Sequence, residues 1–140
     1  MDLLVAEGIG TLCISKNPLW KQRANLGTRT NQSFVSVPHA RFIQMLTDKA
    51  ELVGIQVGVT EESYTSRASF LDGDPLPIYG GAEAPSFSGR RVKRGLYRAA
   101  DGWHINADAN GSYNIIRKVA LEAFAQGSGG CVVHPIRFAV

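Results

Sequence analysis

The stretch from residue 105 to residue 120, INADANGSYNIIRKVA, decides how the chain folds, because its polar first residues lead directly into apolar residues at helical spacing. This spacing predicts a helix over about residues 109–124, with an apolar stripe formed by Ile116, Val119, Ala120 and Ala123. Asp108 stands at the start of this helix, among Asn106, Asn110 and Asn114. An aspartate in this place has two interpretations: a helix cap, or a carboxylate that binds a metal ion.

The helical spacing puts Asp108 on the same face as Ile115 and Val119, so we expect its carboxylate at the top of the buried side of the helix. It would then point towards neighbouring strand ends, whereas a cap needs only to reach the amides of the next turn. The asparagines would support the local backbone. Spacing alone leaves both interpretations open.

Upstream of this helix, two β-rich runs flank another helical pattern. Residues 9–15, IGTLCIS, and residues 55–60, IQVGVT, each predict a strand. Between them Pro38 opens a helix that ends at Gly54, with Phe42, Met45, Leu46, Lys49, Ala50 and Val53 at helical spacing. This order is an α/β pattern. Two strands are too few for a stable sheet, so further strands lie in the long segment 64–105, or the chain joins a larger sheet, which we favour.

Composition bounds the class of protein. The chain has 140 residues, 44% of them hydrophobic and 19% charged, with a net charge of +3, as in globular proteins with a mild basic bias. No signal peptide or membrane span is visible, which favours the cytoplasm. Cys13 and Cys131 are the only cysteines, too few for a four-cysteine zinc ribbon.

Two glutamates offer a second carboxylate. Glu61 and Glu62 follow the strand 55–60, and strand alternation points Glu61 along the face of Val57 and Val59. A carboxylate at a strand end and Asp108 at a helix start could share Mg²⁺ or Mn²⁺, and such ions support phosphodiester cleavage. The alternative is a solvated strand end.

Cations and aromatic residues alternate between Phe87 and Arg98, in FSGRRVKRGLYR. Cations neutralise phosphates and aromatic rings stack on exposed bases, so this run indicates nucleic-acid binding, with a solvated charge run as the alternative. Weaker signals are the hydroxyls of YTSR, for which a turn is the alternative, and the polar, basic segment 16–37. The candidate nucleic-acid contacts are Tyr64, Thr65, Ser66, Arg67, Arg90, Arg91, Lys93, Arg94, Tyr97, Arg98, Lys21 and Arg23.

Other polar residues give weaker evidence of a functional site. His39, His104 and His134 are scattered without metal-ligand spacing, so we expect them to be structural or exposed. Residues 72–74, DGD, are too short for a calcium loop and predict a turn.

Taken together, EESYTSRASFLDGD, FSGRRVKRGLY and INADANGSYNI resemble the C-terminal part of TnpB proteins, the OrfB-type transposases of bacterial insertion sequences and relatives of type V CRISPR effectors. The resemblance implies a partial RNase H-like (RuvC-like) α/β fold and RNA-guided, Mg²⁺-dependent DNA cleavage in the bacterial cytoplasm, with DNA and guide RNA as partners. Asp108 matches the last catalytic aspartate of that family. Tyr64, Thr65 and Ser66 match the segment that leads into its zinc ribbon.

The chain departs from the family pattern in two places. Arg67, Ala68 and Ser69 replace the expected cysteines, so no zinc is expected and the long basic insertion must be held in another way. Ser15 and Lys16 stand where the family glutamate would follow its strand, and the first catalytic aspartate would lie upstream of this chain. Glu61 or Glu62 could substitute for the glutamate, which leaves an incomplete metal site.

The resemblance divides the chain into the C-terminal half of a RuvC-like core (1–63), a zinc-less insertion that binds target nucleic acid (64–105), a final helix with Asp108 (106–126) and a tail (127–140). The predicted function is the C-terminal segment of a TnpB-like endonuclease that binds nucleic acid and is inactive without an N-terminal partner half. The alternative is a non-catalytic DNA- or RNA-binding module, or a truncated transposase remnant.

Overall fold

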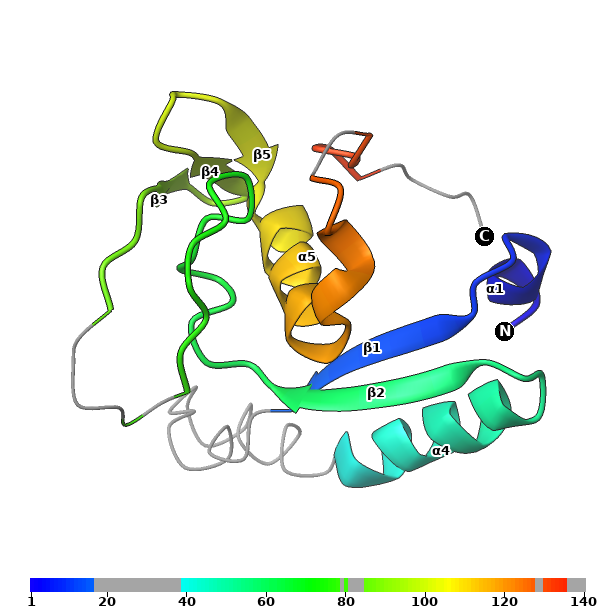
Figure 1. Cartoon of the computed structure of the whole chain (residues 1–140). Coiled ribbons are helices and arrows are strands. Elements are labelled where there is room, and N and C mark those ends of the chain that lie inside the picture. Colours follow the sequence, from blue (N-terminus) through cyan, green and yellow to red (C-terminus); the bar gives the residue numbers. More distant parts are fainter. Residues whose placement is uncertain (17–38, 79, 81–84, 128–129, 136–140) are drawn as a thin grey trace. The chain divides into compact units, whose positions relative to one another are not determined.

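The computed structural model describes residues 1–16, 39–78, 80, 85–127 and 130–135. The chain divides into two compact units, Met1–Glu61 and Glu62–Val140. Figure 1 labels the helices and strands of both. Within the described residues, no helix combines the length and the apolar character that crossing a membrane requires.

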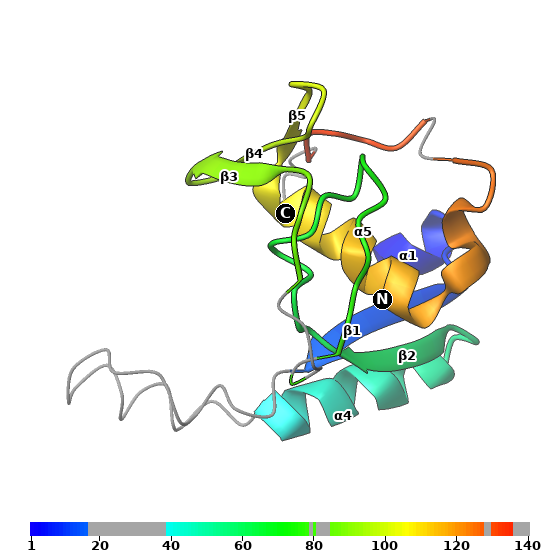
Figure 2. The same cartoon turned by 60° about the vertical axis from the view of Figure 1, so that its left-hand side comes forward.

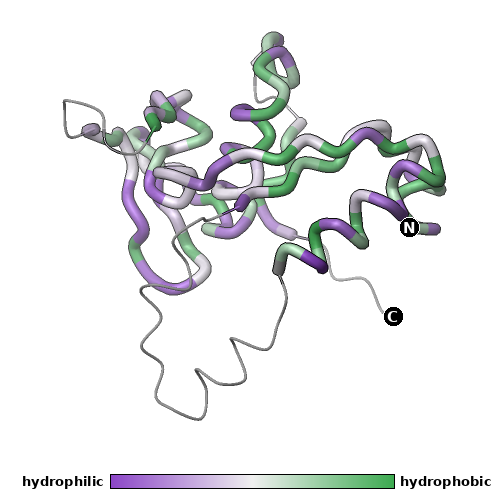
Figure 3. Tube along the Cα trace, turned by 90° about the horizontal axis from the view of Figure 1, so that it is seen from below, coloured by the Kyte–Doolittle hydropathy of each residue, from purple (hydrophilic) through white to green (hydrophobic). Residues whose placement is uncertain are grey.

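The first unit is built on two parallel strands. Helix α1 (Asp2–Ala6) precedes β1 (Thr11–Lys16), and α4 (His39–Glu51) leads into β2 (Gln56–Glu61). β1 pairs with β2 from Thr11 opposite Gln56 to Lys16 opposite Glu61. Figure 3 shows hydrophobic and polar residues along both strands, and none of the strand residues is fully buried. Both predicted strands are confirmed, although each begins and ends slightly later in the sequence.

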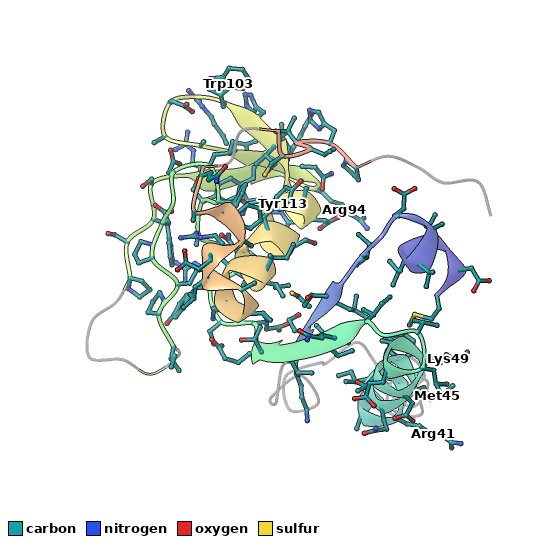
Figure 4. The ribbon with its side chains drawn as sticks, turned by 45° about the vertical axis from the view of Figure 1, so that its right-hand side comes forward. Arg41, Met45, Lys49, Arg94, Trp103 and Tyr113 are labelled. Atoms are coloured by element: carbon teal, nitrogen blue, oxygen red, sulfur yellow. The ribbon has the colours of Figure 1, made fainter. Side chains whose placement is uncertain are left out.

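Helix α4 lies along β2 (Figure 1) and buries Ala50 completely, next to the buried Ile55 that precedes the strand. The predicted apolar stripe is only partly correct, since Phe42 and Met45 are 57% and 50% exposed. Figure 4 shows Arg41, Met45 and Lys49 together on the side of α4 that faces away from the strands. The 3.6-residue period predicted the helix. Both faces of α4 contain hydrophobic and polar residues, so the period did not identify the face that packs against the strands.

The second unit contains a three-stranded antiparallel sheet that we did not predict. β3 (Arg90–Lys93), β4 (Leu96–Arg98) and β5 (His104–Asn106) pair in the order β3–β4–β5. Gly95, with φ 76°, makes the β3–β4 turn, a conformation that glycine adopts without strain. The segment 64–105 therefore does contain further strands, but they form a sheet of their own and do not extend β1 and β2, so the larger sheet that we favour for those two strands stays a prediction.

Helix α5 (Ala107–Val119) and the short 3₁₀ helix η1 (Leu121–Phe124) complete the second unit. Figure 2 shows the sheet seated at the first turn of α5. The core consists of Phe70, Tyr97, Ile105 and Ala107, and Phe70 stacks on Tyr113 with ring centroids 4.6 Å apart. The predicted helix 109–124 is corrected, because α5 starts earlier and Ala120 leaves the helical conformation, with φ −124° and ψ 85°.

Candidate nucleic-acid interface

The start of α5 is capped by Asn106 and not by Asp108. The Oδ1 atom of Asn106 accepts hydrogen bonds from the backbone N–H groups of Asp108, at 2.9 Å, and of Ala109, at 3.0 Å. The Asp108 side chain is 88% exposed, and its carboxylate lies 3.9 Å from the Arg91 guanidinium. The cap interpretation of Asp108 is therefore wrong, as is its placement on the buried side of the helix.

Two other asparagines of the opening stretch are completely buried and bind a distant loop. Asn110 accepts a hydrogen bond from the Phe70 N–H and donates one to the Ala68 carbonyl, both at 2.9 Å. Asn114 donates to the carbonyls of Thr65 and Ala68, also at 2.9 Å. These amides satisfy backbone groups that would otherwise be buried without partners, so they fix the loop against α5.

The same loop is also held by a buried carboxylate. Asp74 is 5% exposed and accepts hydrogen bonds from the Ser69 N–H, at 2.7 Å, and from the N–H and hydroxyl of Ser88. Arg117 donates to the carbonyls of Gly73 and Asp74. The DGD sequence was interpreted only as a turn; in the structure its second aspartate joins two segments 14 residues apart.

Tyr97 ties the sheet to this loop from the inside. Its ring is 1% exposed, and its hydroxyl donates a 2.7 Å hydrogen bond to the Arg67 carbonyl. Burial, followed by the negative charges of Asp74 and Asp72, raises the pKa of Tyr97 to about 12. The phenol is therefore a neutral hydrogen-bond donor across the physiological range.

The outer face of the sheet carries a row of basic side chains. Arg90 pairs directly with Arg98, and Arg98 pairs with His104 on the next strand. All three residues are exposed. Residues opposite each other on antiparallel strands project from the same face, and this face is opposite to the one that buries Tyr97. We call Arg90, Arg98 and His104 the basic row.

Gly89 allows β3 to start this close to β4. A Cβ atom at Gly89 would lie 2.6 Å from the Arg98 carbonyl oxygen and 2.6 Å from the Tyr97 ring, which is closer than real Cβ contacts. Any side chain here would push the first residue of β3 away from the sheet. The glycine thus helps to place Arg90 in the basic row.

A groove lies beside the basic row, between Ser66–Arg67 on one side and Phe87–Arg91 on the other. Its volume is about 520 Å³. The Arg67 guanidinium carbon lies 5.5 Å from the centroid of the Phe87 ring. The centroids of the Tyr64 and Phe87 rings are 5.8 Å apart. A second hollow of about 480 Å³ shares Phe87, Gly89 and Arg90 with this groove and extends to Arg98. Cations and an aromatic ring therefore line a continuous stretch of surface.

The structure brings together most of the predicted nucleic-acid contacts, but two of them are buried. Thr65 is 5% exposed and its hydroxyl donates to the Glu62 carbonyl, while Tyr97 is in the core. Their side chains therefore support the surface from the inside, in place of the direct contact that we predicted. Lys21 and Arg23 lie outside the described residues. Lys93 and Arg94 are exposed.

The predicted metal ligands fall in different units, with Glu61 ending β2 and Asp108 and Glu62 in the second unit. Their pairing therefore stays a prediction. Within the part of the chain that the structure describes, no three His, Cys, Asp or Glu residues are grouped so that they could hold a metal ion. Asp108 and one glutamate would need further ligands to form a two-metal site.

The comparisons with known proteins agree with these features. The Cas12f1-like TNB domain, a domain of the TnpB/Cas12 family, matches residues 39–115, which is more than half of the 140-residue chain. The matched region includes the basic row, the groove and most of α5. No curated protein is significantly similar to the sequence. The chain belongs to the Cas12f1-like TNB domain family, and it is similar to the C-terminal part of TnpB-type proteins.

Proposed function

We propose that the second unit binds nucleic acid through the basic row and the groove beside it. The observation that carries this proposal is the direct cross-strand pairing of Arg90 with Arg98, and of Arg98 with His104. Arg90 and Arg98 are like charges directly opposite each other, which destabilises a sheet, so the protein retains this pair at a cost. A phosphate backbone bound along the row would neutralise these charges and release counterions.

The TnpB/Cas12 family relationship supports a more specific role. In that role the chain binds the target DNA and the guide RNA of an RNA-guided nuclease. Asp108 would contribute one carboxylate for Mg²⁺, because it is exposed in the first turn of α5, where the helix dipole stabilises negative charge. The missing ligands would come from an N-terminal half, so the chain alone would bind nucleic acid without cleaving it. The alternative role is a non-catalytic DNA- or RNA-binding module or a transposase remnant.

Salt-dependent binding tests the proposal. We expect the full chain to bind fluorescent oligonucleotides in anisotropy titrations, with an affinity that falls linearly on a log–log plot against salt. Replacing Arg98 with alanine should reduce the slope by about 1, since one phosphate contact is lost. Arg41→Ala removes the same charge from the outer side of α4 and serves as the matched control. Equal slopes for wild type and Arg98→Ala would refute the basic row as the binding surface.

Cleavage is tested separately with Mg²⁺ and labelled DNA. We expect no product from the isolated chain, because two-metal hydrolysis needs more carboxylates than Asp108 and Glu61 supply. Cleavage by the wild type that disappears in Asp108→Asn would contradict the expectation that the chain is inactive alone. It would also show that Asp108 acts in a complete site.

A further inference from the structure

The groove beside Phe87 has features that a phosphate-binding surface alone does not require. The half-buried Phe87 ring forms part of its wall, with the Arg67 guanidinium 5.5 Å from the ring centroid. Arg90 and Arg91 follow at the edge of the same groove. The Arg67 guanidinium lies over the Phe87 ring, so the ring and the planar cation together form the layer on which a nucleobase stacks, and Arg90 and Arg91 are placed for its phosphates.

Both walls of the groove are fixed in advance of binding. On one side, the Arg67 carbonyl accepts the Tyr97 hydroxyl and the Arg67 N–H donates to the Tyr64 carbonyl. On the other side, Ser88, next to Phe87, donates from its N–H and its hydroxyl to the buried Asp74. A rigid wall loses little conformational entropy when a ligand binds, which favours affinity for a flat partner.

We propose that Phe87, together with Arg67, stacks on an unpaired base, so that this groove is a single-strand-selective site within the nucleic-acid interface. This inference rests on the proposed nucleic-acid binding and adds the strand type that the groove selects. In a duplex the faces of each base are covered by its neighbours, whereas an unpaired base can turn its face to a protein ring. The volume of about 520 Å³ falls in the range of small-ligand pockets, which suits one nucleotide.

The experiment compares single-stranded DNA with a blunt-ended duplex of the same composition, using anisotropy and the full chain. Loss of one stacked base should weaken single-strand binding by roughly 5- to 150-fold in Phe87→Leu, while duplex binding changes by less than about 2-fold. Phe87→Trp should restore single-strand binding, because it restores the ring and not merely the volume. Circular dichroism of both variants establishes that each is folded.

A strand of abasic phosphodiester units isolates the stacking contribution. Wild type and Phe87→Leu should bind this strand equally, because it carries charge but no base. Equal weakening of single-strand and duplex binding by Phe87→Leu, or no rescue by Phe87→Trp, would overturn the stacking site and leave the proposed function intact. Absence of salt-dependent binding of any oligonucleotide by the wild type would instead overturn the proposed function itself.

Discussion

The buried amide of Asn110 gives the sharpest test of how the second unit is held together. Replacing it with alanine removes the acceptor for the Phe70 N–H and one donor to the Ala68 carbonyl. Phe70 is 4% exposed, so its N–H group would be left buried without a partner, at a cost of about 1–3 kcal/mol. The Ala68 carbonyl keeps its bond from Asn114, so the second loss adds about 1 kcal/mol or less.

Alanine favours the helix over asparagine by about 0.6 kcal/mol, which offsets part of this loss. The net decrease in the free energy of unfolding should therefore be about 0.5–3.5 kcal/mol. For a unit of this size that corresponds to a fall in Tm of about 2–28 °C. Asn110→Asp should also destabilise, because it turns a carboxylate oxygen towards the Ala68 carbonyl in place of the amide donor.

Urea unfolding of the full chain in a Trp20→Phe background measures this effect, because Trp103 in the second unit then supplies the tryptophan fluorescence. Figure 4 shows Trp103 projecting from the turn between β4 and β5. Ser112→Ala, at an exposed position of the same helix, is the matched control and should change stability little. If Asn110→Ala were no more destabilising than Ser112→Ala, the amide would not hold the loop.

Three further predictions follow from the same contacts. Gly89→Ala should unfold the second unit at lower urea concentration and weaken oligonucleotide binding, because its Cβ would lie 2.6 Å from the Arg98 carbonyl oxygen; an unchanged midpoint would contradict this. The raised pKa of Tyr97, about 12 against an ordinary 10, means that its stabilising effect is complete below pH 10 and is lost as the pH rises from 10 through 12. Urea midpoints should fall over that interval, and by less in Tyr97→Phe. Chelation with EDTA should leave the midpoint unchanged, since hydrogen bonds hold the loop around Asp74; a marked decrease would reveal a structural metal.

The elements that the sequence predicted are those with a continuous hydrophobic period. β1, β2, α4 and α5 each present apolar residues at the spacing of their own secondary structure, so a local pattern is sufficient. Their ends were less accurate, because Ala120 has no residue-specific signal for leaving a helix. The three strands of the second sheet are short and rich in arginine, and a bulge between Arg91 and Lys93 interrupts their alternation.

The sequence predicted the charged residues of the candidate site, but it did not predict the buried residues that hold them in place. The alternation of cations and aromatics in segment 87–98 indicated the basic surface directly. By contrast, Asn110 contacts Ala68 and Phe70 across about 40 residues of sequence, as its hydrogen bonds show. Asparagine side chains are usually exposed, so the residue type gave no reason to expect Asn110 to be buried. Only the fold reveals the partners of Asn110.

These buried supports connect stability to binding. The Arg67 side of the groove is anchored through the Tyr97 hydroxyl, and the Phe87 side through Ser88 and Asp74. The intervening loop is fixed to α5 by Asn110 and Asn114. Positions at which TnpB-type relatives are expected to place zinc-binding cysteines thus lie in a loop that here depends on one carboxylate and two amides. Loosening any of these bonds should therefore widen the groove and reduce its preorganisation, so that binding of single strands weakens before the second unit unfolds.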